Sequence, residues 1–514
     1  MNIRKIYIGL IVFLLMGLFY AWTSETRALS TATHMSEVEY EKSLPTVSDD
    51  GNYISIENDL LKIRVAVKTG AIVEARLKKY KVENSDSALG SRVFGSDDSS
   101  LFKYYFKSGF TGQNLNYELD SYSDNFVILL DKEVGIRKKI SFLPETYELS
   151  VTDSSINGVN GKAFASLYRT GGRSLDLKTN MADGGFMNSS SYEGVAISTE
   201  KDAYETTRLR SLDEPISELS RSGWIAFIEK YFFAALLGSE GVIYNYIAQP
   251  ANAGIYSMGY TVEKPETQNL VYEHTHRLFI GPKIRKDLET RAENLELSID
   301  MGWFWFISQP MVLFLDLING VVGSWGLSIV IFTILLKLLL WPVTAKGYAS
   351  MAGMRKVAPE MKELQERYKN DRQKLGTETM ALYKKHNANP VGGCLPMLAQ
   401  MPFFIGFFFA LREMVELRHA SLGFWLTDLS VPDPLFILPI LFGMVMVLTQ
   451  RLNPQPAMQD QTQAQVIKYM PVIFSGFFFV MPSALALYSV INSGVSLIQQ
   501  RLIYKKHGAN VDGS

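Results

Sequence analysis

The sequence predicts a membrane α-helical bundle joined to an all-β sandwich domain. First, apolar segments of about 20 residues, the length that crosses a bilayer, recur in the chain after residue 320. Second, residues 51–300 alternate apolar and polar side chains with a period of two, which is typical of half-buried antiparallel strands. Third, the 514 residues are 47% hydrophobic and 20% charged, a composition between those of a soluble protein and a pure membrane bundle.

The composition excludes several classes of protein. The formal net charge of -1 gives no basic signature for nucleic-acid binding. The single cysteine, Cys394, cannot form an intramolecular disulfide. Residues 51–300 contain no glycine-rich phosphate loop, nucleophile elbow or zinc-ligand spacing. His274 and His276 would share one face of a strand, but two histidines make a weak metal site, and ordinary surface histidines are the alternative. We therefore predict no catalytic residue, no cofactor and no metal.

The N-terminus is expected to be a transmembrane signal anchor over residues 1–22. Arg4 and Lys5 precede an apolar run that extends to residue 22. A cleaved signal peptide is the alternative, but we favour retention because the run is long and no clear small-x-small cleavage site follows directly. The basic flank places the N-terminus in the cytoplasm. Residues 23–50, rich in Ser, Thr and Glu, are expected to form a linker.

Residues 51–300 predict a large β-sandwich, because clusters of Gly, Asn, Asp and Ser separate many period-2 segments. The alternating apolar residues are Ile54 and Ile56; Leu61, Ile63, Val65 and Val67; Ile136, Ile140 and Phe142; and Tyr147, Leu149 and Val151. The apolar stretch 226–237 fits either a core strand or a helix, which periodicity alone cannot distinguish. A solvated sheet surface explains the many carboxylates, and the residues do not reveal the role of this domain.

Residues 301–320 are expected to form an amphipathic helix in the membrane interface. An aromatic cluster at 303–306 is of the kind enriched at bilayer interfaces. Pro310 can start a helix with Asp316 and Asn319 on its polar side. Its apolar side would carry Met311, Phe314, Leu315 and Ile318.

The span expected over residues 321–342 carries one cation, Lys337. A lysine at the centre of a span costs about 2.5–3.5 kcal/mol, and such residues usually face a bundle interior or a wet cavity. The alternative is that the lysine side chain snorkels to the interface, since Trp341 follows after about one turn. Thr333 lies one turn earlier on the same face and favours the cavity.

Residues 346–388 predict a cytoplasmic helical hairpin. Its basic residues outnumber its acidic ones, which marks the cytoplasmic side of a membrane. Apolar residues recur at helical spacing in two segments, with a turn expected at Asn370-Asp371. The Met-rich faces are either an adaptable docking surface or the contact between the two helices.

Four further spans follow the hairpin in a core domain that covers residues 321–505. Their expected bounds are 395–417, 434–452, 468–481 and 483–503, and a tail follows at 506–514. Six crossings that begin inside put the hairpin, the Gln-rich loop and the tail in the cytoplasm, and they put the β-domain outside. The positive-inside rule is then met at every turn.

Polar residues also lie at membrane depth in other spans. Gln400 lies in the span at 395–417, and the final span carries a polar face at i, i+3, i+4 and i+7: Ser489, Asn492, Ser493 and Ser496. Interhelical hydrogen bonds, worth about 0.6 kcal/mol each, could account for the final span alone. However, no Asp or Glu lies well inside a predicted span to pair with Lys337, and an unpaired cation in a sealed core is prohibitive. We therefore predict a water-filled, positively charged groove that opens to the cytoplasm and attracts acidic or polar peptide segments.

Several motifs after residue 300 give a specific resemblance. They are Gly302-Trp303 and Gln309-Pro310, Leu340-Trp341-Pro342-Val343-Thr344, Met380-Ala381-Leu382-Tyr383-Lys384, Asn389-Pro390-Val391-Gly392-Gly393-Cys394-Leu395-Pro396, Gln400-Met401-Pro402, Val415-Glu416-Leu417-Arg418, Asp428-Leu429-Ser430 and Met470-Pro471-Val472-Ile473-Phe474. The chain resembles the YidC-type bacterial membrane protein insertases that have a large periplasmic domain. The motifs cover residues 301–505, and the β-domain fits by size and position.

The resemblance implies a five-helix insertase core, an N-terminal span, a periplasmic β-sandwich and a hydrophilic groove around one cation. Members usually have arginine at the position of Lys337, and they carry a tyrosine at the position of Ser489, which here follows Tyr488. The implied groove residues are Lys337, Thr333, Gln400, Tyr488, Ser489, Asn492 and Ser493. The implied apolar path for a substrate helix consists of Phe404, Phe442 and Phe477.

The implied function is non-enzymatic. An insertase captures hydrophilic segments of nascent membrane proteins and releases their apolar helices sideways into the lipid of the bacterial inner membrane, alone or with the Sec translocon. In some members a basic tail contacts the ribosome. Two alternatives are an anion or solute transporter that binds at Lys337, and a membrane-anchored enzyme whose active site lies in the β-domain. A transporter often contains internal repeats, and we find no convincing repeat.

Overall fold

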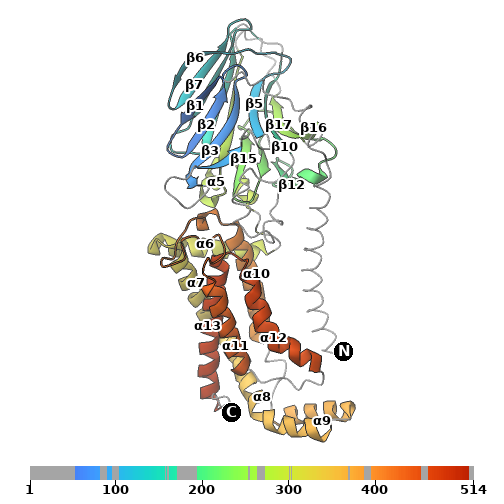
Figure 1. Ribbon diagram of the computed structural model, residues 1–514. Coiled ribbons are helices and arrows are strands. Elements are labelled where there is room, and N and C mark those ends of the chain that lie inside the picture. The colour runs from blue at the N-terminus through green and yellow to red at the C-terminus, as the bar shows by residue number, and fades with distance from the viewer. Residues whose placement is uncertain are drawn as a thin grey trace, which may run out of the picture. The chain divides into compact units, whose positions relative to one another are not determined.

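The computed structural model describes residues 52–81, 90–94, 104–156, 158, 161–170, 194–252, 255–262, 272–299, 301, 304–368, 371–386, 395–452 and 461–508. The chain forms two compact units, Met1–Ile299 and Asp300–Ser514 (Figure 1). The signal anchor expected at 1–22 and the linker expected at 23–50 lie outside the described residues.

Two antiparallel sheets make up the first unit, which confirms the predicted β-sandwich (Figure 1). In order across the first sheet, the described strands are β1 (Tyr53–Glu57), β2 (Leu61–Ala66), β3 (Ala71–Lys81), β5 (Tyr104–Phe110), β10 (Ala163–Thr170), β17 (Ile255–Val262), β16 (Tyr244–Asn252) and β13 (Ile216–Ser220), and β4 (Gly90–Phe94) pairs with β3. Those of the second sheet are β12 (Glu205–Arg208), β11 (Gly194–Ser198), β14 (Trp224–Ile228), β15 (Phe232–Leu237), β18 (Tyr272–Pro282), β9 (Glu148–Ser155), β8 (Ile136–Phe142), β7 (Phe126–Asp131) and β6 (Glu118–Ser123).

The alternation seen in the sequence has the expected effect on burial. In β2 the side chains of Leu61, Ile63 and Val65 are buried, and Lys62 between them is exposed. In β9 the side chains of Leu149 and Val151 are likewise buried. Because successive side chains of a strand point to opposite faces, each strand contributes one apolar row to the space between the sheets.

The stretch 226–237 is neither a single strand nor a helix. It contributes to two strands, β14 and β15, which pair with each other so that Ala226 faces Ala235. All the residues of both strands are buried. Glu229, Lys230 and Tyr231 lie between the strands, and this polar interruption of the apolar run is the sequence feature that marks the turn.

A polar network crosses the core between the two sheets. The ammonium of Lys138 on β8 lies 2.8 Å from Asp153 on β9, and neither side chain is exposed. From the other sheet, Ser108 on β5 accepts a 2.6 Å hydrogen bond from Lys138 and donates one of 2.6 Å to Asp153. His276 lies 3.4 Å from Asp153 and its Nδ1 is 3.0 Å from the hydroxyl of Tyr260. Each buried charge is therefore paired, as burial in a core requires.

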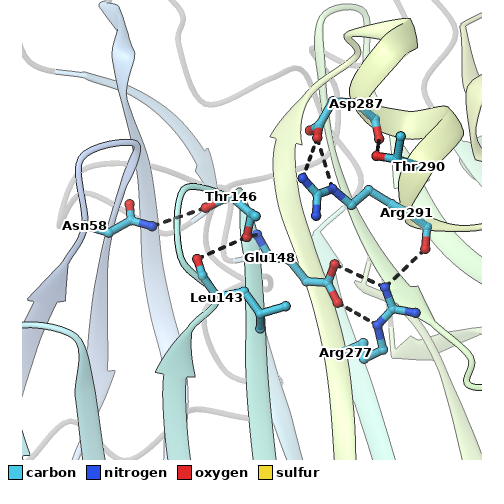
Figure 2. Close-up of polar contacts among 8 residues, drawn as sticks. All are labelled: Asn58, Leu143, Thr146, Glu148, Arg277, Asp287, Thr290 and Arg291. Atoms are coloured by element: carbon cyan, nitrogen blue, oxygen red, sulfur yellow. Dashed lines mark hydrogen bonds and ion pairs between the residues drawn. The ribbon is translucent and has the colours of Figure 1, made fainter.

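A second network joins β18 to β9 and to the helix that follows β18 (Figure 2). Arg277 binds Glu148 of β9 through two hydrogen bonds of 2.6 and 3.2 Å, and it donates a third to the carbonyl of Arg291 at 3.1 Å. Arg291 ends the short helix α5 (Arg285–Arg291) and pairs with Asp287 at 2.7 Å. Arg277 therefore fixes α5 against the second sheet.

Helices form nearly all of the second unit. They are α6 (Trp305–Val322), α7 (Trp325–Leu339), α8 (Trp341–Arg367), α9 (Arg372–Lys385), α10 (Leu395–Glu413), α11 (Ile437–Leu452), α12 (Gln461–Phe477) and α13 (Ser483–Lys506); short 3-10 turns lie at Leu209–Ser211 and Leu295–Ser298 in the first unit and at Val415–Leu417 here. Gly323, in a left-handed conformation, ends α6, so residues 321 and 322 belong to α6 and not to the Lys337 helix.

By length and apolar composition, α6 is the one helix among the described residues that could cross a membrane alone. Helices α7 and α8 are long and apolar enough only when they are taken together as one bent span. Figure 1 shows α6 running crosswise to α10 and α13. Ser308 on α6 donates a 2.8 Å hydrogen bond to the carbonyl of Gly406 on α10. A side chain at position 406 would press on Ile307, so glycine permits this close contact between the two helices.

Candidate functional site

The helix that carries Lys337 is short and ends in a sharp bend. Ser324 caps its N-terminus by accepting a hydrogen bond from the backbone of Leu327. Helix α8 begins directly after Leu340, and the two helices meet at an angle of 67°. Pro342 near the start of α8 explains the break, because proline lacks an N–H group and disfavours helical geometry at the preceding residue.

Lys337 lies in the interior of the second unit, with only 2% of its surface exposed. Its ammonium donates a hydrogen bond to the hydroxyl of Ser496 on α13 at 2.5 Å. Within the described part of the chain, no carboxylate forms an ion pair with it. The position therefore combines a single positive charge with a neutral hydrogen-bond acceptor.

Thr333 is also buried, but its hydroxyl binds its own helix. It donates to the carbonyl of Ile329 at 2.6 Å, four residues earlier. Ser489 on α13 behaves in the same way, since it is buried and donates to the carbonyl of Leu485 at 2.8 Å. Neither hydroxyl is therefore a partner of the ammonium of Lys337 in this structure.

The polar face predicted on the final span lies on one helix, α13. Asn492, Ser493 and Ser496 are half-buried, whereas Ser489 is buried. Only Ser496 of this face bonds to Lys337 among the described residues. Gln400 on α10 is half-buried, and its amide nitrogen has no hydrogen-bond partner among the described residues.

The sequence analysis missed Gln499, which is 1% exposed. Its amide nitrogen lies 3.4 Å from the backbone carbonyl of Lys337, and this carbonyl belongs to the last turn of α7. The signal was available in the sequence, because Gln499 follows Ser496 by three residues and continues the same helical face.

The aromatic residues of the predicted apolar path lie in two clusters. Phe404 on α10 packs against Tyr488 on α13, with ring centroids 6.0 Å apart. Phe407 packs against the same tyrosine at 4.7 Å. Phe442 on α11 contacts Phe478 at 4.6 Å, and Phe477 contacts Phe478 at 6.0 Å. No ring contact joins the two clusters within the described residues.

Apolar side chains cover the outward surfaces of α11 and α12. The exposed ones include Ile440, Leu441, Met444 and Leu448 on α11 and Tyr469, Val472, Ile473 and Phe474 on α12. So many exposed apolar side chains on two helices are unusual on a soluble protein and are typical of a surface that meets lipid or an apolar partner.

The predicted helical hairpin is formed by α8 and α9, and the side chain of Asp371 caps α9. Val357 and Met361 on α8 and Leu382 on α9 form a buried cluster. Thr379 adds a contact of 3.6 Å from its hydroxyl to the sulfur of Met361. Of the two alternatives for the Met-rich faces, the structure therefore favours packing between the helices, although Met380 is 53% exposed.

Two family models match the chain and together cover most of it. The model of the 60Kd inner membrane protein family matches residues 317–510, and that of the YidC periplasmic domain matches residues 53–314. The first contains Lys337, Gln400 and the polar face of α13, and the second contains both sheets.

Curated relatives agree with these matches. A membrane protein insertase YidC from Hahella chejuensis is 34% identical over 512 residues, which cover 94% of this chain and 88% of that protein. One from Pseudoalteromonas atlantica is 35% identical over 489 residues, covering 90% and 87%. These names favour an insertase over the alternative of an anion transporter.

Among solved structures, the crystal structure of YidC from Thermotoga maritima is similar at 13% identity and a TM-score of 0.36, covering 87% of this chain and 96% of that one. An active YidC insertase crystal structure with the first transmembrane domain resolved is similar at 16% identity and a TM-score of 0.40, covering 87% and 91%. On the sequence matches, the chain belongs to the YidC family of membrane protein insertases, bacterial inner-membrane proteins with a periplasmic domain.

Proposed function

We propose that this chain inserts nascent membrane proteins into the bacterial inner membrane by binding their hydrophilic leading segments at Lys337. The observation that carries the proposal is the setting of this ammonium, which is buried beside Ser496 and without an ion pair in the described part of the chain. An ammonium has three N–H donors, and Ser496 accepts one. The others remain for polar or acidic groups of a substrate.

Thr333, Gln400, Tyr488, Ser489, Asn492 and Ser493 are proposed to line a hydrophilic groove around Lys337, open to the cytoplasm. The half-buried state of Gln400, Asn492 and Ser493 supports this, because part of each side chain is accessible from outside the packed core. The amide nitrogen of Gln400, which has no partner in the described part of the chain, can donate a hydrogen bond to a backbone carbonyl of a passing substrate.

The substrate's apolar helix then leaves sideways, past Phe404, Phe442 and Phe477. The exposed apolar surfaces of α11 and α12 support a lateral exit into lipid on their side. Transfer of the apolar helix supplies about 0.8 kcal/mol per buried CH₂ group. The membrane potential adds about 2.3 kcal/mol per charge for each 100 mV.

The proposed topology has both termini in the cytoplasm and five core spans after an N-terminal one. The basic hairpin of α8 and α9 would then meet the nascent chain first, and the Sec translocon and the ribosome are the proposed protein partners. The excess of Lys and Arg in residues 346–388 supports the cytoplasmic placement.

The test is insertion by the purified full chain in liposomes with no other protein present. A small inner-membrane protein is synthesised in the presence of these vesicles, and protease is then added outside. Insertion yields a fragment protected from protease, which empty liposomes do not give. The absence of protected fragment with the chain alone and with co-reconstituted Sec translocon would refute the proposal, and ion flux without insertion would favour a transporter.

A further inference from the structure

The hydroxyl of Ser496 is at the centre of a small hydrogen-bond network. It donates to the carbonyl of Asn492 at 2.8 Å, and it accepts from the ammonium of Lys337 at 2.5 Å. A serine hydroxyl has one donor and two acceptor positions, so these two contacts use its donor and one of its acceptor positions.

Helix α13 contacts both sides of the bend at Leu340. Ser496 binds Lys337 in the last turn of α7, and Ile503 and Tyr504 belong to a buried cluster with Tyr348 of α8. The ammonium of Lys337 is therefore held next to a bend that α13 packs against on both arms. Gln499 holds the same turn of α7 through the backbone carbonyl of Lys337, which positions the helix but leaves the ammonium to Ser496.

We propose that Ser496 is the positioning residue of the insertion site, a role that rests on the proposed function of Lys337. Its hydroxyl binds one N–H of the ammonium and directs the other two toward the groove. Because the hydroxyl's own proton is held by the carbonyl of Asn492, a lone pair of its oxygen is left to accept from Lys337. A substrate carboxylate then meets an oriented cation and not a freely rotating side chain.

The experiment compares two substrates that differ only in the leading segment, which carries aspartates in one and asparagines in the other. Insertion of each by the full chain in liposomes gives a ratio that reports how strongly the site prefers the acidic segment. Three variants are compared with the unmodified chain. Ser496→Ala removes the acceptor, Ser496→Thr restores it, and Thr449→Ala removes a hydroxyl on α11 that binds only its own helix at Val445.

We expect Ser496→Ala to lower the preference for the acidic segment by about tenfold, the factor of one charge-assisted hydrogen bond, because insertion of the aspartate substrate falls far more than insertion of the asparagine substrate. Ser496→Thr and Thr449→Ala should retain the preference. An equal loss with both substrates, or an unchanged preference in Ser496→Ala, would overturn the proposal. If the unmodified chain has no preference for the acidic segment, the electrostatic role of Lys337 itself is refuted.

Discussion

The ammonium of Lys337 and the hydroxyl of Ser496 are 2.5 Å apart, although 159 residues separate them in the sequence. The contact joins α7 to α13 at a point where both side chains lie inside the helical unit. A buried lysine normally needs a carboxylate, and this one has a neutral partner among the described residues. No acidic side chain of the described structure therefore compensates its charge. An acidic segment of a substrate can be attracted to this cation.

Reversal of the charge at position 337 should abolish insertion of a substrate with an acidic leading segment. Lys337→Glu places like charges together, whereas Lys337→Arg keeps the positive charge and should preserve activity. Lys337→Met keeps an unbranched side chain without the charge and should give an intermediate loss. Protease protection in liposomes measures each variant. Lys139→Glu is the control, because it makes the same change of charge at an exposed position of β8, and full activity of Lys337→Glu would contradict the electrostatic step.

The stability of the β-domain should fall as the pH drops below about 6.5. Burial, together with the neighbouring His276, lowers the pKa of His274 to about 3. The unfolded chain therefore binds a proton near pH 6.5 that the folded domain does not, so the free energy of unfolding falls by about 1.4 kcal/mol per pH unit for this residue down to pH 3. Circular dichroism in the β-sheet region, recorded during thermal unfolding of the full chain, measures this loss.

His274→Phe should make the dependence of the melting temperature on pH between about 3 and 6.5 less steep; part of the slope should remain, because burial also lowers the pKa of His276. Tyr246→Phe is a suitable control because burial raises the pKa of Tyr246, which therefore does not titrate in this range. The same slope in His274→Phe and in the unmodified chain would show that His274 is not the titrating group.

Removal of Arg277 should destabilise the β-domain by about 2 kcal/mol. Arg277→Ala leaves Glu148, which is only 1% exposed, without its cationic partner, and it also frees the carbonyl of Arg291. The melting temperature of the β-sheet transition measures the loss. Lys132→Ala breaks an ion pair with Glu118 that is well exposed to water and should leave the melting temperature unchanged.

A smaller side chain at Met361 should loosen the hairpin of α8 and α9. Met361→Ala removes a buried side chain from the cluster with Val357 and Leu382, and we expect a loss of about 2–3 kcal/mol in the local stability of the hairpin. Hydrogen exchange of backbone amides in α9 is the measurement, because it reports local opening. Met380→Ala, at an exposed position of the same hairpin, should leave exchange unchanged, and equal effects of the two variants would argue against helix-to-helix packing.

The sequence predicts the strands well where apolar residues alternate, and it fails where a polar residue interrupts the pattern. Lys138 is the clearest case. It lies between Ile136 and Ile140 on the inward face of β8, so the period of two places it in the core. A buried charge is stable there only with polar partners. These partners, Ser108 and Asp153, lie on other strands, which the sequence does not place beside β8.

The candidate site was also predictable only in part, because the sequence does not show which distant segments meet. The apolar stretch around Lys337 and the polar face of α13 are both visible in the sequence, because each is a pattern within one helix. That Ser496 and not Ser489 meets the ammonium depends on how α7 packs against α13, and this packing depends on the break before Pro342. A pattern within one helix carries no information on its register with another.

The contact between Lys337 and Ser496 also has a consequence for the biogenesis of the protein itself. The ribosome makes the chain from its N-terminus, so Lys337 is synthesised and α7 is formed long before α13 exists. During that interval the ammonium has no serine to bind. Translation of the last helix is therefore the event that completes this site, and a transcript truncated before codon 496 would yield a bundle whose cation never acquires its partner.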